Sequence, residues 1–93
     1  MNVRIGIHDF DDVYYDRSAD VLYLSKGEPQ PAATSRETPE GHVVRLTRDD
    51  EVIGITLISP RGLLARQGRI VVTLPEAVEP DAGQIEAAIS GIA

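Results

Sequence analysis

The stretch that decides the fold is Val52-Ile53-Gly54-Ile55-Thr56-Leu57-Ile58, which is almost wholly β-branched or aliphatic. In a strand, the side chains at 53, 55 and 57 share one face, and those at 52, 56 and 58 share the other. Because both faces are apolar, this strand is predicted to be central in a sheet and to be covered by a helix or a partner chain. Gly54 in its middle predicts a β-bulge or the close approach of an aromatic ring.

The hydrophobic period of two continues outward from this strand along the chain. A polar tetrad at 48–51 joins it to a strand-like stretch at 42–47 and predicts a hairpin. A polar connection at 16–20 predicts a second hairpin between 13–15 and 21–24. Further strands are predicted at the start of the chain, where Val3, Ile5 and Ile7 alternate with Arg4, Gly6 and His8, at 69–74, and as a short edge strand at 33–37 within a proline-rich loop.

Two helices complete the predicted architecture. Ser59-Pro60 is expected to begin a short helix that ends near Gly68, with Ser59 as its N-cap. A second helix opens at residues 79–81, and Ile85, Ile89 and Ile92 form its apolar stripe. A helix this short is marginal alone, so it must dock on the sheet. We therefore predict one α+β domain over residues 1–93, a twisted, mainly antiparallel sheet of about four to six strands in hairpins with a C-terminal helix packed on it.

The composition limits the class of protein. A hydrophobic fraction of 42% and a charged fraction of 26% in 93 residues are typical of one globular domain. No apolar run is long enough to span a membrane, so we expect no membrane partner. The absence of cysteine excludes disulfides, thiolate catalysis and Cys-based metal sites, and we predict no cofactor. The first residues turn acidic where an export signal needs apolar residues, so we expect a cytoplasmic protein.

The charge balance bears on the kind of partner. Nine Lys and Arg against fifteen Asp and Glu give a net charge of −6, which disfavours nucleic acid unless a basic patch compensates. Acids at both ends of the chain would complement a basic protein partner. The candidates for a weak RNA-binding surface are the middle arginines, for which we favour ordinary solvated positions: Arg45, Arg48, Arg61, Arg66 and Arg69.

Carboxylates and phenols gather at the first predicted hairpin. Tyr15, Asp16, Asp20 and Tyr23 are the candidate binding residues, and as a group they suit a small ligand or a metal-dependent acid–base reaction. The structural interpretation competes with this one, because aspartates initiate turns and cross-strand tyrosines pack a sheet. We favour the structural interpretation and assign no catalytic residue.

Two other polar features predict no site. The cluster of His8, Asp9, Asp11 and Asp12 has the residue types of a metal site, but alternation along a strand prevents all four from converging. We therefore predict no bound metal. His42 has no Ser-His-Asp context and no HExxH pattern, so we expect a solvated histidine at a strand edge.

The same hairpin residues resemble a known family. Tyr15-Asp16 followed by 19–24 is similar to a YDxxADxLYI-like pattern in short bacterial and archaeal proteins, and Val43-Val44 with 52–58 resembles a later VVGIEIL-like strand. The family is domain of unknown function 2283, and the resemblance covers roughly residues 13–66. The chain departs from it at Thr56, where the family often has an acid, and at Thr47 and Asp50, where the family tends to have an Asp and a Gly around the turn. Any chemistry of those acids would not transfer to this chain.

The resemblance implies a hairpin-rich domain whose relatives include antitoxin-like companions of small toxin-like proteins. Together with the missing catalytic signatures, it favours a non-catalytic protein-interaction module, with an antitoxin-like protein as its specific form. The doubly apolar strand at 52–58 also predicts a homodimer through a sheet edge or face. The alternatives are an enzyme built on the first hairpin and a weak RNA-binding surface.

Overall fold

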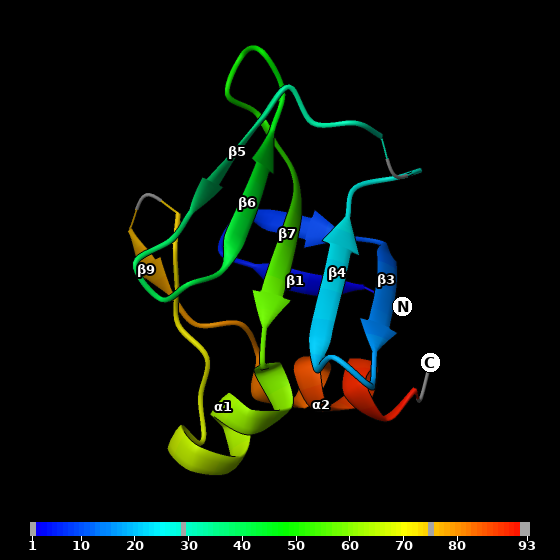
Figure 1. Cartoon of the computed structure of the whole chain (residues 1–93), viewed down its shortest axis with the longest axis vertical. Coiled ribbons are helices and arrows are strands. Elements are labelled where there is room, and N and C mark those ends of the chain that lie inside the picture. The colour runs from blue at the N-terminus through cyan, green and yellow to red at the C-terminus, as the bar shows by residue number, and fades with distance from the viewer. Residues whose placement is uncertain (1, 29, 75, 92–93) are drawn as a thin grey trace.

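The computed structural model describes residues 2–28, 30–74 and 76–91. Its largest element is a five-stranded antiparallel sheet in the order β3-β4-β7-β6-β5 (Figure 1). The predicted central strand is confirmed, because β7 lies between β4 and β6. The predicted short strand in the proline-rich loop is also confirmed, as an edge. The strands are β3 (Asp12–Asp16), β4 (Val21–Ser25), β5 (Thr34–Glu37), β6 (Val43–Leu46) and β7 (Val52–Ile58).

One face of this sheet carries the hydrophobic core. Leu22, Leu24, Ile55 and Leu57 point from β4 and β7 into a cluster of fully buried side chains. That cluster is closed by a hairpin, β1 (Val3–Ile5) with β2 (His8–Phe10), and by helix α2 (Ala82–Ser90), which lie behind the sheet in Figure 1. The α+β class with a C-terminal helix on the sheet is therefore confirmed.

The beginning of the chain differs from the prediction. The alternation of Val3, Ile5 and Ile7 does not continue as one strand, because the chain reverses at Gly6 and Ile7. Gly6 has a φ of 61°, a conformation that glycine adopts without steric cost at the first position of a two-residue hairpin turn. Ile7 therefore projects into solvent, 86% exposed, while Val3 and Ile5 remain in the core.

The stretch at 69–74 also differs from the prediction. Only β8 (Val72–Thr73) is a strand, and it pairs with β9 (Ala77–Val78) in a separate two-stranded sheet. This segment is not part of the large sheet, whose edges are β3 and β5. Its hydrophobic pattern is satisfied by packing, because Ile70 and Val72 are buried in the core.

Gly54 lies beside a register shift, as predicted, but its close neighbour is a different one. Arg45 pairs with Gly54 and Leu46 with Val52, so one residue of β7 is extra at this point. A Cβ at Gly54 would lie 2.9 Å from the carbonyl oxygen of Leu24 and 3.4 Å from Nη1 of Arg45. The prediction of an aromatic ring at this position is wrong, because the Arg45 side chain and the backbone of Leu24 fill that space.

Both helices are present where the sequence places them. Helix α1 (Pro60–Gln67) has proline in its first turn, and α2 begins at the N-cap Asp81, whose carboxylate accepts a hydrogen bond from Gln84 N at 3.1 Å. Ile85 is buried in the predicted apolar stripe, while Ile92 lies outside the described residues. Neither helix has the length and hydrophobicity needed to cross a membrane.

Candidate functional site

Two of the four candidate residues at the first hairpin come together. Tyr15 Oη donates a hydrogen bond to Asp20 Oδ1 at 2.8 Å. The same carboxylate accepts hydrogen bonds from the backbone N–H groups of Arg61 and Gly62, both at 3.1 Å, at the start of α1. Ser59 occupies the N-cap position as predicted, but its side chain makes no capping hydrogen bond. Asp20 therefore supplies the cap from another part of the chain.

The environment of Asp20 keeps it ionised. Burial alone would raise its pKa, but hydrogen bonds from Tyr15, Gly62 and Arg61, with the positive charge of Arg61, hold the pKa below its usual range. Burial raises the pKa of Tyr15, and its hydrogen bond to Asp20 adds to the effect. This pair is an anionic acceptor and a neutral donor joined to each other, an arrangement that orders the turn and the helix.

The other two candidate residues are not hydrogen-bonded to this pair. Asp16 Oδ1 accepts hydrogen bonds from Ser18 Oγ and Ala19 N within the hairpin turn, which lowers its pKa. Tyr23 pairs with Tyr14 across the strands and points to the face of the sheet opposite Tyr15. The structure therefore divides the four residues between two faces and one turn, and it does not gather them around one reacting atom.

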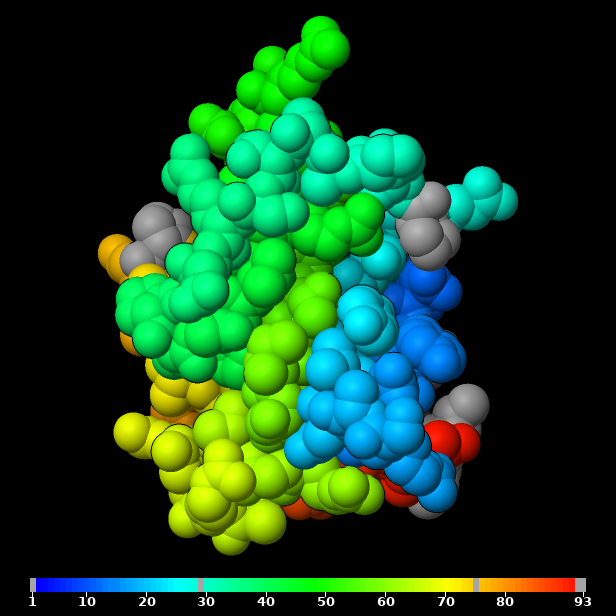
Figure 2. Space-filling view, in the orientation of Figure 1, coloured from blue at the N-terminus to red at the C-terminus, as the bar shows by residue number. Residues whose placement is uncertain are grey.

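The open face of the sheet carries an aromatic pair that the sequence argument did not single out. Tyr14 and Tyr23 stack with ring centroids 5.9 Å apart and are 63% and 44% exposed. Ile58 is exposed on the same face, and in Figure 2 residues of β4 and β7 lie at the surface while most of α2 is hidden behind them. The signal for Tyr14 was present in the sequence, because strand alternation places positions 14 and 23 together and position 15 opposite.

His42 is not the solvated strand-edge histidine that the sequence predicts. It is 1% exposed, because it precedes β6 on the same side as Val44 and therefore points to the core face. Its Nδ1 accepts a hydrogen bond from Ile58 N at 3.0 Å, while its buried Nε2 has no partner within the described residues. Burial lowers the pKa of His42, and the charge of Glu40 opposes that shift only in part.

The middle arginines do not form one patch. Arg45 lies over Gly54 and donates to the backbone oxygen of Gln30, and Arg69 pairs with Glu79 at 3.8 Å. The β6–β7 turn, which contains Arg48, and helix α1, which contains Arg61 and Arg66, lie at opposite ends of the molecule in Figure 1. No ridge of positive charge follows from this arrangement.

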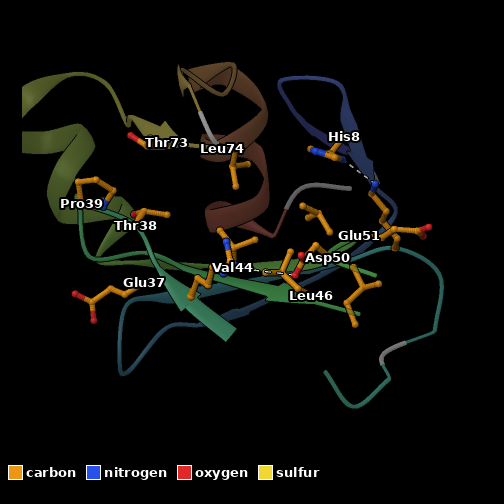
Figure 3. A pocket seen from close by; sticks show the side chains of 14 residues that line it. His8, Glu37, Thr38, Pro39, Val44, Leu46, Asp50, Glu51, Thr73 and Leu74 are labelled. Carbon is orange, nitrogen blue, oxygen red and sulfur yellow. Dashed lines mark hydrogen bonds and ion pairs between the residues drawn. The ribbon is translucent and has the colours of Figure 1, made fainter. Parts of the chain in front are cut away.

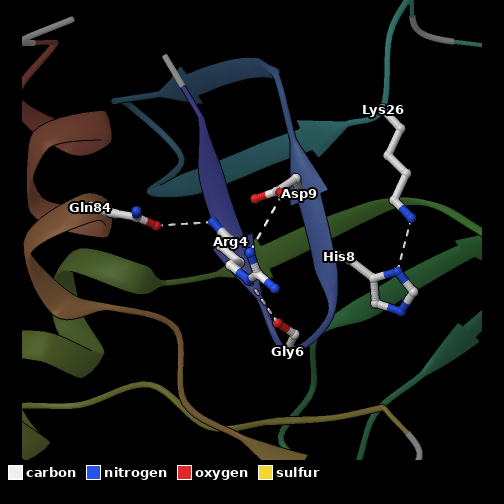
Figure 4. A network of polar contacts seen from close by, with 6 residues as sticks. All are labelled: Arg4, Gly6, His8, Asp9, Lys26 and Gln84. Atoms are coloured by element: carbon white, nitrogen blue, oxygen red, sulfur yellow. Dashed lines mark hydrogen bonds and ion pairs between the residues drawn. The ribbon is translucent and has the colours of Figure 1, made fainter.

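The acidic cluster near His8 also disperses. Asp9 pairs with Arg4 at 3.8 Å, and Asp11 accepts a hydrogen bond from Gly27 N. His8 instead faces Lys26, whose Nζ lies 2.8 Å from His8 Nδ1 (Figure 4). Within residues 2–28, 30–74 and 76–91, no group of three or more His, Asp or Glu side chains is placed to hold a metal ion.

The core side of the sheet contains a cavity that the sequence did not reveal. It has a volume of about 680 Å³ and lies over the β6 and β7 end of the sheet, with β8 and the His8–Lys26 pair on its walls (Figure 3). Volumes of this size are common for small-molecule sites. Its residues come from segments that are distant in sequence, so no local sequence motif predicts it. Its apolar lining consists of Val44, Leu46, Val52, Ile53 and Leu74, with Pro39 at one end.

The fold and these surfaces define a small, hairpin-rich α+β domain. A family model described as "Protein of unknown function (DUF2283)" matches residues 12–59, just over half of the chain, and the chain belongs to this family. The match spans the sheet from β3 to β7 and includes the Tyr15–Asp20 pair. No curated protein and no solved structure gives a match.

Proposed function

We propose that this protein is a cytoplasmic, non-catalytic protein-interaction module that binds a basic protein partner through the open face of its sheet. The observation that carries the proposal is the stacked pair Tyr14 and Tyr23, exposed on a sheet face beside Ile58. Exposed tyrosines are enriched at protein interfaces, where they supply large contact areas and hydrogen-bonding hydroxyls.

The charge beside the tyrosine pair supports a basic partner. Asp12 and Asp16 flank Tyr14 on β3 and share its face, since all three alternate along one strand. The whole chain adds a net charge of −6. Complementary charge of this kind raises the rate of association and selects among partners. An antitoxin-like role, in which the partner is a small basic toxin encoded beside this chain, is the specific form of the proposal.

Purification of the tagged chain from its native host, followed by reconstitution from two purified proteins, tests this function. We expect a stoichiometric complex with a basic protein, whose affinity falls as salt rises. The double variant Tyr14→Ser, Tyr23→Ser should weaken it, whereas Ile7→Ser, which removes an exposed apolar side chain elsewhere, should not. A complex that ignores the tyrosine variant, or the absence of any stoichiometric complex, would contradict the proposal.

We also propose a homodimer, formed through the free edge of β5 so that the open face stays available. Thr38 N donates a hydrogen bond to His42 O, and in an antiparallel ladder only every second residue of a strand bonds to the same neighbour. The backbone N–H and C=O groups of Ser35 and Glu37 therefore point away from β6. Pairing two β5 strands about Ser35 places Arg36 opposite Thr34 of the second copy, without like charges facing each other.

The other edge of the sheet is less suited to self-association. Antiparallel pairing of two β3 strands in full register would bring Asp12 of one copy opposite Asp16 of the other. Light scattering at micromolar concentration tests the β5 dimer, and Ser35→Pro should dissociate it by removing an edge N–H group. A monomer in the unmodified protein would overturn the dimer and leave the interaction module intact.

A further inference from the structure

The cavity on the core side of the sheet has one end that is rich in hydrogen-bond donors. Lys26 Nζ lies 2.8 Å from His8 Nδ1, and since an ammonium can only donate, His8 Nδ1 accepts and its proton resides on Nε2. Burial, and then the charge of Lys26, lower the pKa of His8, which keeps the ring neutral. This end of the cavity therefore presents the remaining N–H groups of Lys26 and the Nε2–H group of His8 (Figures 3 and 4).

The positive charge at this end is not neutralised by a carboxylate in the described part of the chain. Lys26 makes no salt bridge there, and the Phe10 ring lies 5.8 Å from its Nζ. Of the acidic residues on the cavity rim, Asp50 pairs with Arg36 at 3.7 Å, while Glu37 and Glu51 are exposed to solvent. Lys26 and His8 are half-buried, so their interactions with a ligand are screened less than those of the exposed acids.

The rest of the cavity is apolar. Val44 and Leu46 line it from the sheet, and Leu74 faces them from the end of β8 (Figure 3). Ile53 of β7 also lines it. A ligand that fits both parts has a hydrocarbon body and a single anionic acceptor. We propose that this cavity binds a small aliphatic carboxylate, with the hydrocarbon against Val44, Leu46 and Ile53 and the carboxylate accepting hydrogen bonds from Lys26 Nζ and His8 Nε2.

This site is separate from the proposed interaction surface. The cavity lies on the core side of the sheet, whereas Tyr14 and Tyr23 occupy the opposite face. A carboxylate ligand would therefore be compatible with a bound protein partner, and either proposal can fail without the other.

Titration of the full chain with octanoate, followed by methyl and amide NMR, tests the site. We expect saturable shifts at Leu46, Ile53 and Leu74, and an affinity about tenfold higher for octanoate than for 1-octanol, because charge-assisted hydrogen bonds add to hydrocarbon burial. Octylammonium, which has the same chain length and the opposite charge, should bind more weakly than both. These three probes need no variant, so the comparison does not depend on a mutant that folds.

Variants then assign the donors. Lys26→Met keeps the aliphatic stem and should remove the preference for octanoate over 1-octanol. Arg36→Met is the matched control, because it removes a rim cation that already pairs with Asp50, and it should leave the preference within about twofold. Equal binding of octanoate and 1-octanol, tighter binding of octylammonium, or shifts scattered away from the cavity would overturn the proposal.

Discussion

The carboxylate of Asp20, in the turn of the first hairpin, accepts a hydrogen bond from the backbone N–H of Gly62, 42 residues further along the chain. The backbone oxygen of Asp20 also accepts a hydrogen bond from Ser59 N at 2.8 Å. Asp20 thus lies at the end of the β3–β4 turn and also caps the start of α1, so it holds the turn and the helix together at the same end of the sheet.

Removing this carboxylate should destabilise the protein. Asp20→Ala should lower the free energy of unfolding by about 1–3 kcal/mol, because two helix N–H groups and the Tyr15 hydroxyl lose their acceptor. Asp20→Asn should cost less, since it keeps one acceptor oxygen and tolerates the left-handed backbone of this position, φ 54°. Urea unfolding measures both, with Asp16→Ala as the control that disturbs only the turn. Equal stability of Asp20→Ala and wild type would contradict the capping role.

Ser59 should behave in the opposite way to an ordinary N-cap. Its side chain makes no capping hydrogen bond, and its backbone is left-handed with φ 55°. Ser59→Gly should therefore leave the protein equally stable or more stable by up to about 1 kcal/mol, because glycine relieves the steric cost of that conformation. A thermal melt decides the sign. A loss of about 1 kcal/mol or more would show that the hydroxyl caps the helix in solution.

Gly54 and Gly62 form a matched pair for alanine substitution. Gly54→Ala should cost about 1–3 kcal/mol, since the new methyl group would meet the fixed carbonyl of Leu24 at 2.9 Å. Gly62→Ala should be neutral or stabilising by up to about 1 kcal/mol, because its close neighbour at 2.9 Å is the mobile end of Arg66 and the site is helical. Chemical denaturation of the two variants in parallel tests the contrast, and a reversed order would contradict the close approach at β7.

His42 makes the stability depend on pH near neutrality. Its folded-state pKa lies below 6.5, so the unfolded chain binds the proton more readily than the folded one. Stability should be full above pH 6.5 and should fall as the pH drops below that value. Protonation would also remove the acceptor for Ile58 N–H. His8, whose pKa is also lowered, contributes in the same direction and over the same range. Asp16, Asp20 and Glu40, whose pKa values are lowered, add a further loss at more acidic pH, as they become protonated.

Urea midpoints between pH 7.5 and pH 5 measure this dependence. In His42→Gln the slope over this range should be smaller, whatever the change in overall stability. A wild-type midpoint that stays constant down to pH 5 would show that the folded protein accepts the proton on His42 at no cost.

The sheet could be predicted from the sequence because its pattern is local. The apolar run at 52–58, the polar tetrad before it and the five polar residues at 16–20 each identify a strand or a turn without reference to the rest of the chain. The reversal at Gly6 was missed because the alternation of Val3, Ile5 and Ile7 fits one strand as well as two. The prediction for His42 was wrong because it followed the polar residue type, whereas alternation with Val44 and Leu46 places His42 on the buried face.

The candidate sites depend on contacts between distant segments. Tyr15 and Asp20 were identified by residue type at one hairpin, but their connection to α1 is not visible in the sequence. The cavity combines β6, β7 and β8 with His8 and Lys26, which no short motif contains. The exposed pair of Tyr14 and Tyr23 could have been predicted, because strand alternation places these two residues on the same face.

The connection from Asp20 to α1 also bears on where this chain can be shortened. The family match ends at residue 59, directly before the helix whose first N–H groups Asp20 binds. A truncated chain of residues 12–59 would lack the Arg61 and Gly62 N–H groups that donate to this carboxylate, and it would lack β1, β2 and α2, which cover the core face of the sheet. The segment that the family model matches is thus shorter than the set of elements that bury the core, and we expect truncations to that segment to aggregate.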